Sequence, residues 1–198
     1  MPNIYHYDVK NCYYIPGVRN VDGSVTFDNE KVRQEPGLRS MEFQAQGDMN
    51  TIRADGIDYI VVASNNGYTG TLNFVQISDE FRRDNLGETQ DELTGIQFED
   101  ADATPTPFAL MGEFKGDAEG IRWIYYNCIA ARPNQTGDNK DNQKQPDEES
   151  LSVTASPLPI TINGVERNIV RGGILKSSNS ATYDAWFTKV NIPGVASE

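Results

Sequence analysis

The sequence predicts a mainly β protein with two short helices. Short runs of β-branched and aromatic residues recur along the chain, and Gly, Pro, Asn and Asp separate them, which is typical of strands joined by turns. Residues 38–45 and 150–155 alternate apolar with polar side chains, so each of these strands should have one buried and one hydrated face. Helical signals are confined to residues 78–87 and 181–190, and Ser180 is a candidate cap for the second helix.

The length of 198 residues fits one sizeable domain over residues 1–198. Within it we expect a turn-rich N-terminal arm or loop at residues 1–37 and a polar loop between strands at residues 134–149. No apolar run is long enough to span a membrane, and the N-terminal residues have no signal-peptide pattern. Cys12 and Cys128 are too few and too far apart for a disulfide scaffold, so we expect half-buried free thiols and assembly in a reducing cytoplasm.

The net charge of −12 excludes two classes of partner. A nucleic-acid binder needs positive charge to displace the counterions of the phosphates, and docking on an anionic membrane needs it too. The acidic balance fits either a surface that repels phosphate or plain solubility, and charge alone does not separate the two.

The N-terminal segment reads as a strand over residues 3–15, with a break near Lys10-Asn11 and an end at Pro16-Gly17. A short hairpin around Gly23 is compatible with the apolar residues on either side of it. The rest of residues 16–37 forms a long excursion, and such loops are usually functional or disordered.

The stretch that organises the chain runs from Asp58 to Gly87. Its first part, residues 58–64, is a short apolar run that predicts a buried strand, and Asn66-Gly67 allows a reversal into a second strand over residues 71–77. Ser78 is a good N-cap for a short acidic helix, because its hydroxyl can accept a free backbone N–H, and Gly87 suits the position after the helix.

The second half contains two predicted hairpins. Residues 108–114 and 122–131 alternate around a polar turn, and Asn163-Gly164 separates two further apolar runs. Before them, residues 88–102 are acidic without a basic residue, which usually indicates a hydrated face. The inward positions of all these elements predict core residues, among them Phe74, Phe81, Leu110, Tyr126 and Trp186.

No catalytic or metal-binding constellation is recognisable. His6 is the only histidine, and no nucleophile elbow or phosphate-binding glycine loop is present. We therefore expect no catalysis, no metal and no cofactor. Two other classes stay open: a non-catalytic carbohydrate-binding β-sandwich, suggested by Tyr, Trp and Asn/Asp/Gly turns, and a hydrolase with two carboxylates. Packing roles for Trp123 and Trp186, and hydration of the many acids, weaken both.

Seven segments, in this order over most of the chain, carry a family resemblance: Lys10–Tyr14, Asn65–Leu72, Ile77–Gly87, Phe108–Phe114, Tyr126–Pro133, Leu151–Pro157 and Tyr183–Val190, closed by Pro193. Together they resemble the major tail protein, or tail tube protein, of long noncontractile-tailed phages, in the form common among phages of Gram-positive hosts. Residues 18–37 and 158–180 depart from that pattern.

The resemblance implies a β-sandwich or partial barrel with a small flanking helix and a short C-terminal helix. It implies a hexameric ring whose sheets join edge to edge, and a hollow tube of stacked rings that delivers DNA into the host. The partners would be further copies and the tape measure, distal tail and tail terminator proteins. The protein would assemble in the host cytoplasm and reside in the virion tail, with no membrane partner and no specific DNA binding.

Two groups of functional residues follow as expectations. The polar segments 16–37 and 134–149 lack a core of their own, so we expect them to order on neighbouring copies. The candidate assembly residues in the second segment are Thr136, Asp138, Lys140, Asp141, Lys144 and Asp147. A tube that passes DNA should repel phosphate, so we expect acids of the 88–102 run to line the lumen, namely Glu88, Asp91 and Glu92.

Overall fold

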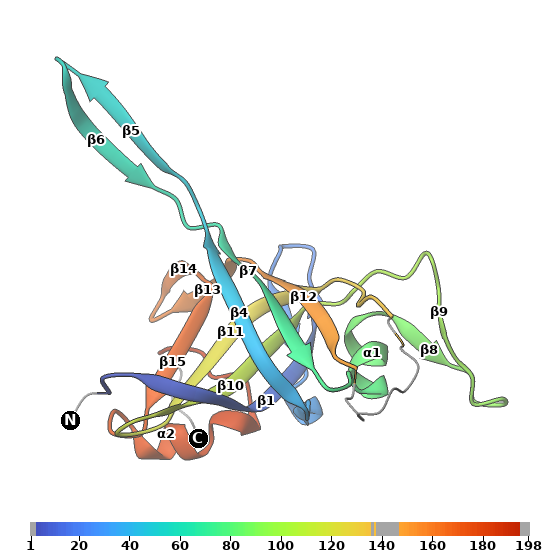
Figure 1. The fold of residues 1–198 in the computed structure, drawn as a ribbon. Helices are drawn as coiled ribbons and strands as arrows, with labels where there is room; N and C mark the ends of the chain where they lie inside the picture. Colours follow the sequence, from blue (N-terminus) through green and yellow to red (C-terminus); the bar gives the residue numbers. More distant parts are fainter. Residues whose placement is uncertain (1–2, 136, 138–146, 195–198) are drawn as a thin grey trace.

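The computed structural model describes residues 3–135, 137 and 147–194, and it is mainly antiparallel β (Figure 1). Its strands are β1 (His6–Arg19), β2 (Val25–Phe27), β3 (Arg33–Gln34), β4 (Leu38–Gln46), β5 (Met49–Ala54), β6 (Ile57–Ala63), β7 (Gly67–Phe74), β8 (Glu88–Gln90), β9 (Gln97–Glu99), β10 (Phe108–Gly116), β11 (Ile121–Ala130), β12 (Glu149–Ala155), β13 (Leu158–Ile162), β14 (Val165–Ile169) and β15 (Arg171–Leu175). The helices are α1 (Asp79–Asn85) and α2 (Ser180–Asp184), with 3-10 turns η1 (Asn29–Lys31) and η2 (Trp186–Thr188).

The main sheet runs in the order β2-β1-β10-β11-β12-β7-β4, with β3 on β1 and β15 on β11. Strand β11 changes partner along its length, because residues 121–125 pair with β15 and residues 128–130 pair with β12. The sheet curls so far that β4 approaches β1. No ladder joins these two strands in the described chain, so the curl is not a closed barrel. The predicted class, a β-sandwich with small helices, is confirmed.

Strands β10 and β11 are buried on both faces and so separate two core layers. The inner layer, enclosed by the curl, contains Phe74, Phe81 and Leu110. The outer layer, beneath the C-terminal segment, contains Tyr126 and Trp186. The structure thus buries all the predicted core side chains, each with at most 4% of its surface exposed.

Helix α1 forms where the sequence predicts it. The Ser78 hydroxyl accepts a hydrogen bond from the backbone N–H of Phe81 (3.1 Å), and the buried carboxylate of Glu35 accepts bonds from the N–H (2.7 Å) and hydroxyl (2.6 Å) of Ser78. Gly87 follows the helix at φ +81°, a conformation that favours glycine. Phe81 meets the rings of Tyr14 and Phe108 edge to face, which anchors α1 in the inner core.

The predicted strand over residues 3–15 is confirmed, because β1 pairs with β10 along most of its length and belongs to the main sheet. The predicted break near Lys10-Asn11 is present as a register shift, with Asn11 at φ +54°. The strand does not end at Pro16-Gly17. Strand β1 continues there but changes its ladder partner from β10 to β2. Proline has no N–H to donate, and the carbonyl of Pro16 accepts a hydrogen bond from the N–H of Asp28. The hairpin around Gly23 is confirmed by the β1–β2 ladder.

The strand predicted at residues 58–64 is present as β6 (Ile57–Ala63), but the prediction that this strand is buried is wrong. Strand β6 is exposed at every residue and pairs with β5 in a hairpin that turns at Asp55-Gly56. Both turn residues have positive φ, as a two-residue turn of this hand requires. Strand β7 pairs with β12 and β4, so Asn66-Gly67 is no hairpin turn. An apolar run in a sequence does not show whether the same chain buries it, and in this chain β6 is left exposed.

The C-terminal helix is shorter than predicted and has a different cap. Asn179, not Ser180, accepts the N–H of Thr182 (3.0 Å), and the 181–190 segment splits into α2 and η2. The β13–β14 hairpin at Asn163-Gly164 is confirmed.

Replacing Phe81 with alanine should lower the free energy of unfolding by about 3–5 kcal/mol, because it removes the ring that joins α1 to the inner core. Phe98→Ala is the matched control, since Phe98 is 47% exposed and should cost much less. Urea denaturation followed by circular dichroism measures both. Equal midpoints for the two variants would contradict the docking of α1.

Candidate assembly surfaces

The β5–β6 hairpin, here called the long arm, projects from the body of the molecule (Figure 1). It carries a run of large exposed apolar side chains: Met49, Ile52, Ile57, Tyr59, Ile60, Val61 and Val62. Cross-strand partners share a face, and successive pairs alternate between faces. The Asn50–Val62 and Ile52–Ile60 pairs therefore lie on one face, and the Met49–Ala63 and Thr51–Val61 pairs on the other. Both faces of the long arm are apolar.

Such an arm is poorly stabilised on its own. Strands β5 and β6 pair only with each other in the described chain, and an isolated two-stranded hairpin is marginal in water. The Arg53–Asp58 ion pair at 2.7 Å is exposed and therefore adds little. Contiguous exposed apolar patches mark interaction surfaces. Because both faces of the long arm are apolar, a partner surface is needed on each face.

The outward face of β4, β7 and β12, here called the polar face, is of opposite character. Its regular positions carry hydroxyl and amide side chains with Glu42 as the one carboxylate: Ser40, Glu42, Gln44, Gln46, Thr69, Thr71, Asn73, Ser150, Ser152 and Thr154. At the irregular start of β4 the exposed Arg39 is paired with Glu148. A shallow hollow lies among Glu42, Thr71 and Ser152. Strand β4 is the last strand of the sheet, and its outer edge carries no ladder in the described residues.

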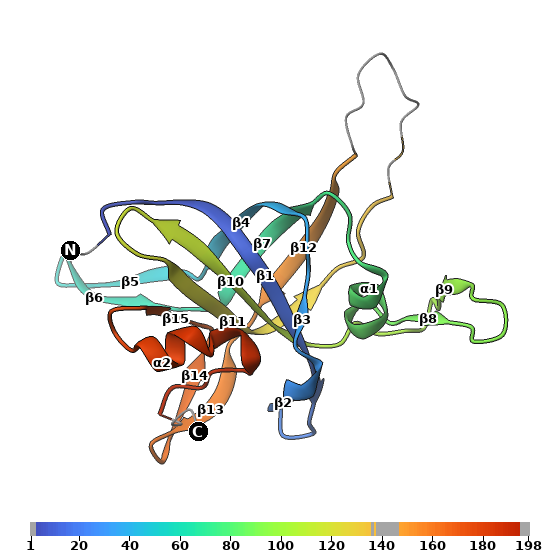
Figure 2. The same cartoon turned by 90° about the horizontal axis from the view of Figure 1, so that it is seen from below.

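The predicted lumen acids lie together on the β8–β9 hairpin, here called the short arm, beyond α1 (Figures 1 and 2). Glu88 is paired with Arg82 (3.5 Å) and accepts a bond from Gln97 (2.6 Å). Asp91 accepts bonds from the Thr94 hydroxyl and from backbone N–H groups of the tip, which lower the pKa of its carboxyl. Glu92 is exposed. Their place in a lumen stays a prediction.

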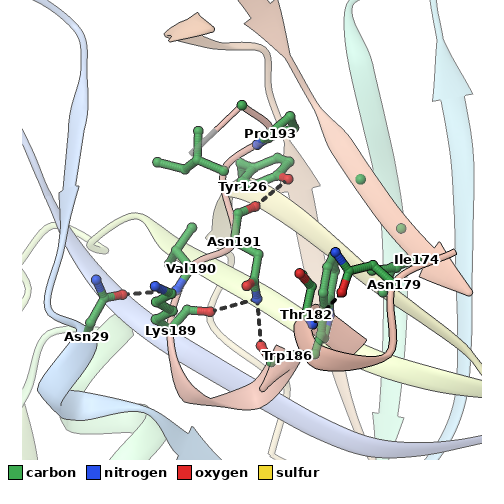
Figure 3. A pocket seen from close by; sticks show the side chains of 14 residues that line it. Asn29, Tyr126, Ile174, Asn179, Thr182, Trp186, Lys189, Val190, Asn191 and Pro193 are labelled. Atoms are coloured by element: carbon green, nitrogen blue, oxygen red, sulfur yellow. Dashed lines mark hydrogen bonds between the residues drawn. The ribbon is translucent and has the colours of Figure 1, made fainter. Parts of the chain in front are cut away.

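A cavity of about 570 Å³ lies beneath the C-terminal segment (Figure 3). Tyr126 and Trp186 give it an apolar wall, together with Ile174, Val190 and Ile192. Hydrogen bonds hold its shape: the Tyr126 hydroxyl donates to the Asn191 carbonyl (2.8 Å), and the Asn191 amide donates to the Trp186 carbonyl (2.8 Å). Burial raises the pKa of Tyr126. Lys189 also lines this cavity, and no ion-pair partner for it lies among the described residues.

A buried ion-pair network ties this C-terminal segment to the sheet. Glu113 is only 6% exposed and pairs with Arg122 (3.0 Å) and Lys10 (3.1 Å). Burial alone would raise the pKa of Glu113, but hydrogen bonds from Arg122 and Lys10 outweigh it and lower the pKa. The Arg122 guanidinium lies over the ring of Tyr183 in α2 (3.9 Å to the centroid) and donates to the Tyr183 carbonyl.

The tryptophans form no open platform, and the exposed aromatic rings include the neighbouring pair Tyr5 and Tyr7, whose planes are tilted by 40°. Trp123, Tyr125 and Phe114 line a second cavity of about 410 Å³ with His6 and Arg171, but both tryptophans of the chain are buried in the core. Cys12 and Cys128 are fully buried free thiols, more enclosed than expected, and burial raises the pKa of each. Among the described residues no cluster of three or more His, Cys, Asp or Glu side chains is placed to hold a metal ion.

Most of the predicted assembly loop lies outside the described residues, namely Thr136, Asp138, Lys140, Asp141 and Lys144. Asp147 is exposed, and its neighbour Glu148 pairs with Arg39 of β4. The other polar segment, 16–37, packs within the chain as β2, η1 and β3, so it does not need a neighbour to order.

The sequence predicted a surface at the short arm but not at the long arm, whose second strand it predicted to be buried. The Asp55-Gly56 dipeptide was a usable signal for the long arm, because Asp-Gly between apolar runs is a strong hairpin signature. No comparable signal marks the cavity, which residues far apart in sequence create.

Comparison with known proteins identifies no relative: no protein-family model matches the chain, and no curated protein matches it either. No helix in the described part of the chain has the length and apolar character needed to cross a membrane.

Glu113→Gln should lower the free energy of unfolding at neutral pH by about 1.5–3 kcal/mol, because it removes a charged hydrogen-bond partner of Arg122. The lowered pKa makes the contribution of Glu113 fully present above its unfolded pKa of about 4.3, and lost as the pH falls through the folded pKa. The gap in stability between wild type and variant should therefore shrink on acidification.

Thermal unfolding at pH 7 and at pH 3 measures that gap. Glu166→Gln is the control, because Glu166 is exposed and should match wild type at both values. A gap for Glu113→Gln that is unchanged at pH 3 would contradict the ion-pair account.

Proposed function

We propose that this chain is a non-catalytic structural subunit of a phage tail tube, in which hexameric rings stack into a hollow conduit for DNA. The observation that carries the proposal is the long arm, whose two faces are both apolar and both uncovered. Its location would be the virion tail, next to the tape measure, distal tail and tail terminator proteins. The seven segments that resemble tail tube proteins support the same conclusion.

The long arm favours self-assembly over binding of a small ligand. A ligand site is a concave pocket, whereas this surface is a projecting ribbon that must enter a gap between other surfaces. Neighbouring copies in a ring, or in adjacent rings, provide such a gap on both sides of the arm. Burying a single valine or isoleucine contributes about 1.5–3 kcal/mol, so several of them give a substantial driving force.

The polar face supports a conduit. DNA must pass such a wall without being held. A surface of hydroxyl and amide groups, on which Arg39 is paired with Glu148, offers no free cation to displace counterions from phosphates. The unpaired edge of β4 also allows the sheets of adjacent copies to join, which removes an exposed edge. We therefore assign the lumen wall to the polar face ahead of Glu88, Asp91 and Glu92, since Arg82 of α1 already neutralises Glu88.

The carbohydrate-binding alternative gains less support. Sugar platforms use exposed aromatic rings, while Trp123 and Trp186 are buried and the polar face carries no aromatic side chain. The exposed rings of Tyr5 and Tyr7 are tilted by 40° to each other and so do not form one flat surface. A melting shift on addition of sugars to a monomer would favour that alternative.

Val62→Asp should block assembly, because it places a charge in an interface that buries the long arm. Val165→Asp is the matched control: both valines lie on hairpin strands, and they are 51% and 54% exposed. Size-exclusion chromatography and negative-stain microscopy should show rings or tubes for wild type and for the control, and monomers for Val62→Asp. A monomeric wild type at all concentrations would refute the proposed function.

Assembled tubes should not bind duplex DNA at physiological salt, because 29 acidic side chains outnumber 17 basic ones and the basic side chain at the edge of the polar face, Arg39, is paired with Glu148. Filter binding at low and moderate salt measures this. Thr69→Lys with Thr71→Lys on the polar face should create salt-sensitive retention, whereas Thr89→Lys on the short arm should not. Tight binding by wild-type tubes would contradict the conduit.

A further inference from the structure

The short arm combines acidic charge with an apolar tip. Residues 88–102 contain six acids and no basic residue. The acids at the base of the arm are neutralised within the chain, since Glu88 pairs with Arg82 and Glu99 with Arg132 (2.5 Å). The tip keeps its charge at Asp91 and Glu92, and beside them Leu93 is 93% exposed and Ile96 62% exposed. Two large apolar side chains this exposed on one hairpin tip leave apolar area that a partner surface would remove from water.

The C-terminal segment has the complementary properties. Residues 158–194 carry four basic side chains (Arg167, Arg171, Lys176 and Lys189) and two acidic ones (Glu166 and Asp184), which leaves a net charge of +2 in a chain of −12. The cavity of this segment is apolar inside and has Lys189 in its lining (Figure 3). Its volume of about 570 Å³ is far larger than one side chain needs, and Asn29 and Asn191 hold it open through backbone hydrogen bonds.

We propose that the tip of the short arm of one copy docks into this cavity of the next copy, with Leu93 inside and Glu92 facing Lys189. The inference rests on the proposed function, because it names a contact that joins neighbouring copies. The occupant is a second copy of the chain because charge and apolar surface match: an acidic tip with exposed apolar side chains meets an apolar cavity that Lys189 lines, in a segment of net charge +2.

The two surfaces lie on different sides of the molecule. The short arm extends beyond α1, whereas α2 and the C-terminal segment lie on the other side of the curled sheet (Figures 1 and 2). One copy therefore cannot fill its own cavity with its own arm. The contact is head to tail, and contacts of this type generate rings when the rotation closes and filaments when it does not. Asp91 and Glu92 at the tip of the short arm then attract the basic segment of the next copy, and they are not needed to repel DNA.

Cysteine cross-linking tests the contact directly. Glu92→Cys protein is mixed with Lys189→Cys protein under mild oxidation, and non-reducing gels should show a disulfide-linked dimer. The native Cys12 and Cys128 are buried and should stay unreactive. Val21→Cys mixed with Lys189→Cys is the control, because Val21 is fully exposed on a different turn. An equal yield from both mixtures, or no dimer from the first, would overturn the proposal.

Assembly measurements separate this contact from the proposed function. Leu93→Asp should raise the concentration needed for assembly roughly tenfold or more, while Val21→Asp leaves it unchanged. Glu92→Lys and Lys189→Glu should each weaken assembly, and the two changes together should restore it. If wild type forms tubes and Leu93→Asp forms them equally well, the docking proposal falls and the tube proposal stands. If wild type never assembles, the tube proposal falls, and the cross-link still decides whether the tip meets the cavity.

Discussion

The burial of β10 and β11 on both faces is the constraint on which the fold depends. The curled sheet and α1 cover one face of β10 and β11, and the C-terminal segment covers the other face. Elements from both ends of the chain must therefore pack before these two strands are buried. Gly112 lies at the centre of the arrangement, because the Trp123 ring occupies the space that any side chain at position 112 would need. The Glu113–Arg122 ion pair then fastens the outer layer to the same two strands.

A register shift in β11 makes the curl geometrically feasible. The β10–β11 ladder is irregular between the Phe108–Cys128 and Leu110–Tyr125 pairs, and in this interval β11 passes from β15 to β12. Bulges bend a strand and leave a residue without its ladder partners. Here Asn127 is buried but satisfied, since its side-chain oxygen accepts a bond from Arg19 (2.9 Å) and its carbonyl accepts the N–H of Ser156 (2.9 Å). The polar groups that the bend frees are thus paired.

The sequence predicted those parts of the fold that depend on interactions between neighbouring residues. It did not predict the parts that depend on contacts between distant segments. The cap of α1, Gly87 after it and the Asn163-Gly164 hairpin follow from interactions within a few residues, and the sequence therefore revealed them. The exposure of β6 and the passage of β1 through Pro16 depend on which strands lie alongside, and hydrophobicity does not report this. The candidate surfaces were harder still: the cavity joins Asn29 to residues beyond 170, and the polar face combines three strands from two halves of the chain.

A subunit with apolar arms must stay in solution until it meets the right partner. The run from Tyr59 to Ala63 has high β propensity, no charge and no proline, which is the pattern of a segment that pairs indiscriminately. Charged residues flank it within the long arm, with Asp58 next to the run and Arg53 opposite, and charges placed this way oppose edge-to-edge stacking. A net charge of −12 adds long-range repulsion between free copies. Two copies can then associate only through surfaces whose local attraction exceeds this repulsion. In the described chain the positively charged C-terminal segment, with its apolar cavity, provides such a surface.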